Sequence, residues 1–222
     1  MDDFDGIAAL AEPVRRALFR FVAAQPEPVG REQVAAAVGV PHHVAKFHLD
    51  KLEAEGLLEV EYRRPPGRGG PGAGRPAKLY RRAAREIALS VPPRRYDLVG
   101  RVMAAAIAAA ERTATPVTET LPAAARDAGR ALGEQARRPA PAADLVRDVL
   151  AGNGYEPLPT TTGIALANCP FRALAVDWTD VVCAINVDLV GGLLTALGAD
   201  GELEARLAPD PGRCCVVVEP RP

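Results

Sequence analysis

Apolar positions recur with a helical period in the first part of the chain. Within the segment 12–22, Val14, Leu18 and Val22 follow one another at intervals of four residues, which places them on one face of a helix. Pro13 suits the first turn of this helix, where a missing N–H group costs nothing. The pattern therefore predicts an amphipathic helix that packs on a core.

Two further short helices are predicted after it, over 31–38 and 42–55. Each is followed by a glycine, Gly39 or Gly56, which favours the left-handed conformation common at helix C-termini. The inward face of the second of these helices is predicted to consist of Val44, Leu49 and Leu52, with Phe47 close by.

The pattern then changes to one typical of strands. The segment 57–62 is rich in β-branched and aromatic residues, and 77–81 reads as the returning strand of a hairpin. Between them lies a tip of Gly, Pro and Arg, 63–76. The order of helices followed by a hairpin predicts a winged helix-turn-helix domain.

Helical and strand patterns alternate in the rest of the chain. Helices are predicted over 97–113, 117–137, 142–150 and 180–198, and strands over 162–166, 203–207 and 214–218. The helix over 180–198 is apolar almost all round, which predicts that it is buried. The fold class is mixed α and β, with an N-terminal winged helix-turn-helix (1–92), a helical linker for dimerisation (93–140) and a small C-terminal α/β domain (141–222).

The charge is distributed unevenly between the two halves of the chain. The net charge of the 222 residues is −1, but residues 1–95 hold 16 basic and 12 acidic residues, and residues 96–222 hold 11 and 16. Such asymmetry is typical of a protein in which one half binds nucleic acid. Double-stranded DNA is therefore the expected partner of the N-terminal half.

The predicted DNA contacts come from the third helix and from the hairpin. The N-terminal residues of a recognition helix meet base edges in the major groove, and a basic wing can follow phosphates. The candidate DNA-binding residues are His42, His43, Lys46, His48, Lys51, Arg63, Arg64, Arg68, Arg75 and Lys78.

The chain resembles the ArsR-type winged-helix transcriptional regulators. The likeness rests on the motifs at 12–18 and 40–58, and the hairpin segment 74–80 is similar to a branch with a long C-terminal sensing domain. It extends into that domain at 168–171, 182–183 and 211–215. This branch includes the repressor of iron–sulfur assembly genes, whose cysteines hold a cluster. The resemblance implies a homodimeric regulator whose DNA affinity is set by its C-terminal domain.

The four cysteines leave three interpretations open. Cys169 and Cys183 are separated by thirteen residues, as in the cluster-binding repressor, and thirty residues later follow Cys214 and Cys215. They are candidate ligands of an iron–sulfur cluster or metal, but the intermediate cysteine of that repressor is missing here, near Asp200. Buried cysteines that only pack, or thiols that sense redox state, are the alternatives.

The sequence contains neither a targeting signal nor a known catalytic motif. The acidic start of the chain is unlike a signal peptide, and no apolar run is expected to span a membrane, so we expect a cytoplasmic protein with thiols in place of stable disulfides. The nucleophile-elbow, P-loop, dinucleotide and zinc-protease motifs are all missing, so we expect no enzyme.

The predicted function is that of a DNA-binding regulator, a repressor, controlled by its C-terminal domain. One alternative is a redox or iron–sulfur protein that uses the helix-turn-helix as an interaction scaffold. Another is a sensor of a small apolar ligand, with Tyr155, Phe171 and Trp178 around the ligand and Gly191-Gly192 allowing close approach.

Overall fold

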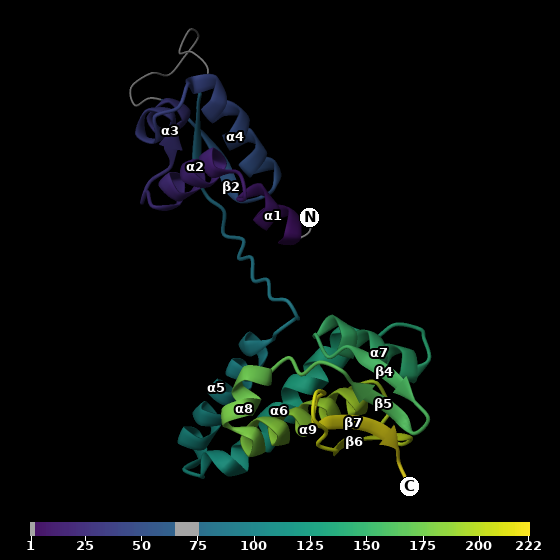
Figure 1. Ribbon diagram of the computed structural model, residues 1–222. Helices are drawn as coiled ribbons and strands as arrows, with labels where there is room; N and C mark the ends of the chain where they lie inside the picture. Colours follow the sequence, from purple (N-terminus) through teal and green to yellow (C-terminus); the bar gives the residue numbers. More distant parts are fainter. Residues whose placement is uncertain (1–2, 65–75) are drawn as a thin grey trace. The chain divides into compact units, whose positions relative to one another are not determined.

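The computed structural model describes residues 3–64 and 76–222. The chain divides into two compact units, Met1–Leu89 and Ser90–Pro222 (Figure 1). Each unit has a hydrophobic core of its own, so each is described separately.

The first unit consists of short helices packed against a small sheet. Leu18, Leu49 and Leu52, which the structure buries completely, form the centre of the core between these helices. Three antiparallel strands in the order β1-β3-β2 cover it. The helices are α1 (Asp3–Ala9), α2 (Pro13–Ala23), α3 (Arg31–Val38) and α4 (His42–Ala54), and the strands are β1 (Val29–Gly30), β2 (Leu58–Arg63) and β3 (Ala77–Arg82).

The sequence determines the ends of these helices locally. The carboxylate of Glu12 accepts hydrogen bonds from the backbone N–H groups of Val14 (3.0 Å) and Arg15 (2.5 Å), which caps the start of α2. These bonds, the one from Arg15 above all, lower the pKa of Glu12. At the end of α3, Gly39 takes a φ of 72°, which allows the sharp turn into α4.

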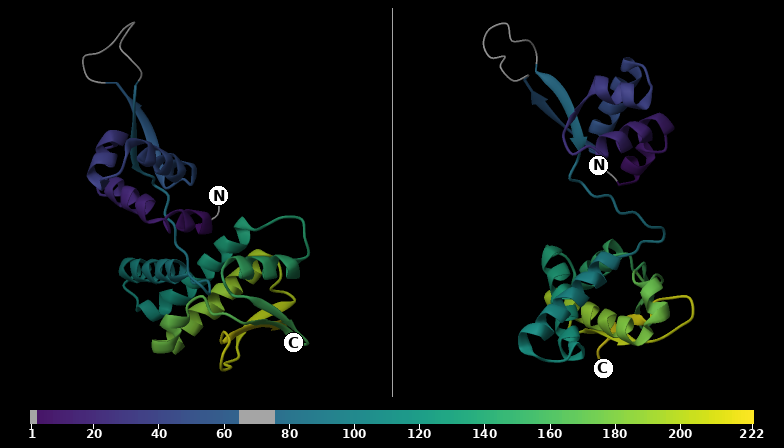
Figure 2. Two further views of the ribbon diagram at one scale, coloured as in Figure 1. Left: turned by 45° about the horizontal axis from the view of Figure 1, so that its top comes forward. Right: turned by 90° about the vertical axis from the view of Figure 1, so that its left-hand side faces the viewer.

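The second unit packs helices on one side of a four-stranded antiparallel sheet (Figure 2). The strand order is β4-β5-β7-β6, and α9 contacts β6 and β7. Helix α6 lies on α9, and α5 lies on α6. The helices are α5 (Tyr96–Thr113), α6 (Val117–Gln135), α7 (Ala142–Gly152), α8 (Arg172–Asp177) and α9 (Thr179–Ala196), and the strands are β4 (Pro157–Thr160), β5 (Gly163–Leu166), β6 (Leu203–Leu207) and β7 (Val216–Pro220).

Glycines allow α6 and α9 to approach with no side chain between their backbones. A Cβ atom added to Gly129 would lie 1.8 Å from the carbonyl oxygen of Leu189, and one added to Gly192 would lie 2.1 Å from that of Arg126. A Cβ atom added to Gly133 would lie 2.7 Å from the Cβ atom of Ala196. We call this contact the glycine seam.

The predicted mixed α and β fold is confirmed, with several differences in detail. Four short elements, α1, β1, β4 and α8, have no counterpart among the predicted ones. The structure groups residues 93–140 with 141–222 in the second unit. Among the described residues, α9 is long and apolar enough to cross a membrane by length and composition alone. More than half of α9 is buried, as in the core helix of a soluble protein.

Candidate nucleic-acid interface and cysteine site

Helix α4 presents an exposed face at its N-terminal end. His42, His43 and Lys46 all lie on this face and are exposed, as predicted for a recognition helix. Pro41 stands at the N-cap, and no side chain bonds to the first-turn N–H groups. This end of α4 therefore combines cationic and hydrogen-bonding side chains with free backbone donors.

Phe47 also belongs to this exposed face. Its side chain is 67% exposed, so the prediction that it lies close to the inward face is wrong. The buried positions of α4 are Ala45, Leu49 and Leu52, so the prediction is correct for the two leucines, and Ala45 takes the inward place predicted for Val44, which is partly exposed. A large exposed apolar side chain on a recognition helix can contact the methyl group of thymine. Residue type alone places a phenylalanine in the core, and no signal in the sequence marks Phe47 as exposed.

A polar network holds α4 against the wing strand β3. The ammonium of Lys78 lies 3.1 Å from Asp50 Oδ1 and 2.5 Å from Glu53 Oε2. The hydroxyl of Tyr80 donates to Asp50 Oδ1 (3.3 Å) and accepts from Arg31 Nη2 (3.2 Å). Burial lowers the pKa of Lys78, but the bonds to the two carboxylates outweigh it and raise that pKa overall.

This network changes the role of some predicted DNA contacts. Lys78 is turned toward α4, so it positions the recognition helix and we do not include it in the proposed interface. His48 is mostly buried, and its Nδ1 lies 3.5 Å from Glu12 Oε2 on α2, so we leave it out for the same reason.

Three further predicted DNA contacts lie on α4 and at the end of β2. Lys51 pairs with Glu55 at 2.5 Å and keeps about half of its side chain exposed. Arg63 pairs with Glu61 at 2.7 Å, and Arg64 is exposed next to it. Arg68 and Arg75 lie outside the described residues.

The four cysteines of the second unit form two pairs. Cys183 on α9 and Cys215 before β7 form a disulfide with a Cα–Cα distance of 6.5 Å, so these two residues are not free thiols in this structure. The fold brings the two residues within the range that a disulfide requires. Cys169 and Cys214 are buried free thiols. The strand that was predicted to start at 214 begins at Val216, so Cys214 and Cys215 precede it.

The two free thiols share a hydrogen bond. The Cys214 thiol donates to the sulfur of Cys169, which lowers the pKa of Cys169 to about 7 and raises that of Cys214. Asn186 Nδ2 donates to Cys214 Sγ at 3.2 Å, and the Tyr155 hydroxyl donates to Asn186 Oδ1 at 2.6 Å. Arg94 donates to the Cys169 carbonyl oxygen at 3.1 Å. This buried polar chain adjoins the disulfide, since Asn186 lies one helical turn from Cys183.

The arrangement does not fit an iron–sulfur cluster. Such clusters are held by four protein ligands as a rule, and in this structure only Cys169 and Cys214 are free thiols. Among the described residues, no group of three or more His, Cys, Asp or Glu side chains is arranged to hold a metal ion. The candidate metal set of Cys169, Cys183, Cys214 and Cys215 thus stays a prediction that requires a reduced protein.

The three aromatic residues considered for a ligand pocket do not share one. Tyr155 and Phe171 are buried and pack edge to face with ring centroids 6.2 Å apart, whereas Trp178 is 59% exposed. Of the two glycines, Gly192 faces the backbone of α6, so it serves helix packing.

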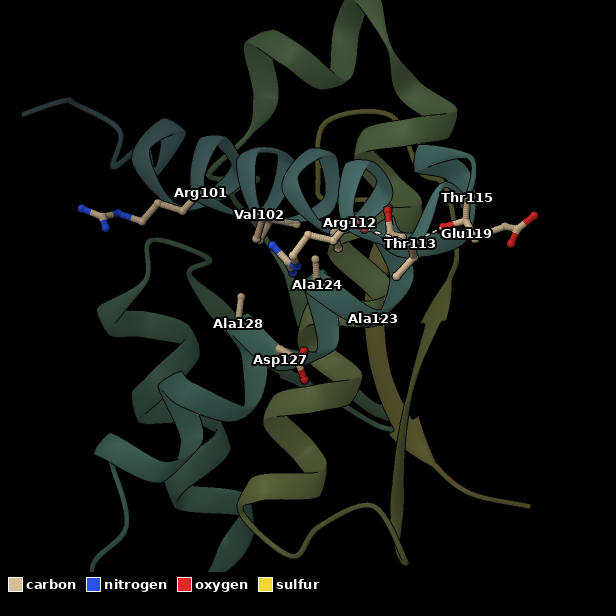
Figure 3. Close-up of a pocket in the computed structure, with 13 residues that line it drawn as sticks. Arg101, Val102, Arg112, Thr113, Thr115, Glu119, Ala123, Ala124, Asp127 and Ala128 are labelled. Atoms are coloured by element: carbon tan, nitrogen blue, oxygen red, sulfur yellow. Dashed lines mark hydrogen bonds between the residues drawn. The ribbon is translucent and has the colours of Figure 1, made fainter.

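A groove of about 580 Å³ lies elsewhere in the second unit, between α5 and α6 (Figure 3). Its floor is made largely of alanines, and charged side chains line its walls.

Comparison with known proteins identifies part of the chain. The family model of a helix-turn-helix domain matches residues 10–61, which cover α2, α3, α4 and part of β2. No curated protein and no solved structure matches the chain. This match supports a DNA-binding transcription regulator with an ArsR-like helix-turn-helix.

Proposed function

We propose that the chain is a cytoplasmic transcription repressor that binds DNA as a homodimer and is controlled by its second unit. The observation that carries the DNA-binding part is the exposed face of α4, fixed to the wing strand by Lys78 and Tyr80. A recognition helix held in this way keeps its orientation when it enters the major groove. The proposal includes no catalytic activity.

The exposed side chains divide into two kinds of DNA contact. Lys46 can donate to guanine O6 or N7, and Phe47 can pack on a thymine methyl group. His42 and His43 offer further donors and acceptors at base edges. Arg63 and Arg64 stand at the end of β2, where they can pair with phosphates, and the predicted contacts of Arg68 and Arg75 would extend this wing.

The cysteine site supports control by redox state. Disulfides in cytosolic proteins are usually transient, and many of them sense oxidants. Cys183 and Cys215 form such a pair in the core of the second unit. The effector in this proposal is therefore an oxidant or a low-molecular-weight disulfide, which accepts two electrons and two protons from the two thiols as the Cys183–Cys215 disulfide forms. A low-molecular-weight thiol returns them when this disulfide is reduced.

The iron–sulfur branch of the regulators is not supported by the disulfide form of the site. Reduction of Cys183 and Cys215 would give four thiols in one region of the second unit. Iron and acid-labile sulfide analysis of protein purified without oxygen tests this alternative directly. Protein free of iron after anaerobic reconstitution would leave the thiol proposal in place.

DNA binding can be tested with a duplex selected from a random library. For this duplex, we expect Lys46→Ala to cost about 1–3 kcal/mol of affinity and to relax the base preference. Arg64→Ala should lower affinity for all sequences and reduce the slope of log K against log salt by about 0.9. Arg147→Ala, an exposed arginine of the second unit, is the control. Equal effects of all three variants would contradict the assignment of α4 and β2.

Control by redox state can be tested with the same duplex. We expect the dissociation constants of oxidised and dithiothreitol-reduced protein to differ by about fivefold or more, the usual size of an allosteric coupling. In the Cys183→Ser variant the two conditions should give one value. An unchanged affinity in the wild type would remove the redox-sensing part of the proposal and leave DNA binding intact.

A further inference from the structure

The middle of α5 lacks polar side chains although much of it is exposed. From Val102 to Ala110 every residue is apolar, yet Ala104, Ala105 and Ile107 are exposed. Ile107 alone is 49% exposed. An apolar helix surface of this kind usually packs against another element.

A groove between α5 and α6 lies on the side of α5 that carries the exposed Ala105, whereas Ile107 lies on the opposite flank of the helix. The groove is lined by Ala105 and Ala109 of α5 and by Ala123, Ala124 and Ala128 of α6. The small side chains leave room for a further helix at close range. Thr113, Thr115 and Thr120 also line the groove, and the hydroxyls of Thr113 and Thr120 donate to the carbonyl oxygens of Ala109 and Ala106.

The walls of the groove carry opposite charges. Arg101 and Arg112 come from α5, whereas Glu119 and Asp127 come from α6 (Figure 3). Arg112 and Glu119 both lie near the turn that joins the two helices. Arg101 and Asp127 both lie farther from this turn, by about 18 Å and 15 Å at a rise of 1.5 Å per residue. Each arginine of one wall is thus level with a carboxylate of the other.

We propose that a second copy of this chain occupies the groove, with the two-fold axis running along it. This inference rests on the proposed homodimer and specifies its interface. The axis places α5 of each copy over α6 of the other, so that Arg112 meets Glu119 of the partner subunit and Arg101 meets Asp127 of the partner subunit. The result is a four-helix bundle in which neighbouring helices are antiparallel.

The competing two-fold arrangement fits the charges and the chain path less well. An axis across the groove would stack α5 on α5 and bring arginines of the two copies together. It would also start the two α5 helices at opposite ends of the bundle, roughly 27 Å apart for 18 residues. The axis along the groove starts both α5 helices at one end. Both N-terminal units are then tethered from that end, as a palindromic operator requires.

Sedimentation of the full-length chain tests the packing of the groove. Ala105→Glu adds a charge to an exposed position that the dimer would bury, so we expect its dimer dissociation constant to rise about hundredfold. The matched control is Ala143→Glu, an exposed alanine in the first turn of α7, which should leave the constant unchanged. Far-UV circular dichroism of both variants verifies that the fold is intact.

Mixing of charge-reversed variants tests the geometry. Arg112→Glu and Glu119→Arg should each weaken the dimer about tenfold, because each juxtaposes like charges twice. An equimolar mixture should restore the wild-type constant, since both contacts between the two variants then pair opposite charges. The stacked α5 arrangement predicts no such rescue.

The outcomes separate the two proposals. A monomeric wild-type chain at tens of micromolar would overturn both the homodimer and this interface. A dimer that Ala105→Glu leaves intact would overturn the interface alone. A monomer that carries a small molecule in native mass spectrometry, lost in Ala105→Glu, would reassign the groove to a ligand.

Discussion

The two units hold their central helices, α4 and α9, in place by different kinds of contact. In the first unit, α4 is fixed to β3 by charged and hydroxyl groups around Asp50. In the second, α9 is fixed to α6 by the absence of side chains at the glycine seam. The polar network tolerates small adjustments because side chains can rotate, whereas a backbone contact without intervening side chains cannot adjust. The polar network thus keeps the orientation of α4 while its side chains make small adjustments, whereas α9 cannot shift relative to α6.

The sharpest test of this contrast is a pair of adjacent glycines in α9. Gly192→Ala should destabilise the second unit by about 4 kcal/mol, because the new methyl group meets backbone that cannot move aside. Gly191→Ala should stabilise it by about 0.5–1 kcal/mol, since this position has no neighbour within 4 Å. Urea unfolding followed by Trp178 fluorescence, the one tryptophan of the chain, measures both. Similar values for the two variants would refute the seam.

Reduction of the disulfide should lower the stability of the second unit and leave that of the first unit unchanged. Cys183 and Cys215 are 32 residues apart, so opening the loop should cost the second unit about 3 kcal/mol. The first unit contains no disulfide among its described residues and should keep its stability. Urea unfolding with and without dithiothreitol, followed by Trp178 fluorescence and by circular dichroism, checks this. A loss shared by both units would show that they do not unfold independently.

Removal of one hydroxyl from the polar network should have a smaller effect. Tyr80→Phe leaves Asp50 and Arg31 without their shared partner in a buried place, so we expect a loss of about 1 kcal/mol in the first unit. Arg81→Ala breaks only an exposed pair with Glu59 and should cost about 0.5 kcal/mol or less. Urea unfolding followed by circular dichroism measures the loss of stability in each of the two variants. The Trp178 transition should be the same in both variants, which is the control for the second unit.

The last test concerns a pH dependence of the second unit. The pKa of Cys169 is lowered from 9.0 to about 7, so between these values the unfolded chain binds more protons than the folded one. The free energy of unfolding of the second unit should therefore rise from pH 7 to pH 9. The contribution of Cys169 is lost as the pH falls from 9 through 7. Unfolding curves at pH 7, 8 and 9 should show this rise in the wild type and a flat profile in Cys169→Ser. A rise retained in that variant would assign the effect to another group.

The sequence predicted the elements whose signals are local. The bounds of α3 agree with the prediction because Gly39 ends it, and β6 agrees because its residues alternate in polarity. By contrast, α1 and α8 have seven and six residues, too short for a periodic pattern. β1 has two residues and exists only through its pairing with β3.

The candidate sites depend on contacts between distant segments, which the sequence alone does not contain. Lys78 was assigned to DNA by its charge, but Asp50 lies 28 positions away and draws it to α4. Likewise, nothing in the spacing of Cys183 and Cys215 distinguishes a disulfide from a ligand pair. Only the packing of α9 beside β7 brings them together.

The glycine seam also has a mechanical consequence. Helices whose backbones touch have no compressible layer of side chains between them, so α6 and α9 are expected to move as one rigid body. Cys183 lies on α9, and the acidic wall of the α5–α6 groove lies on α6. A displacement that begins at the disulfide therefore reaches that wall without any side chain having to repack on the way.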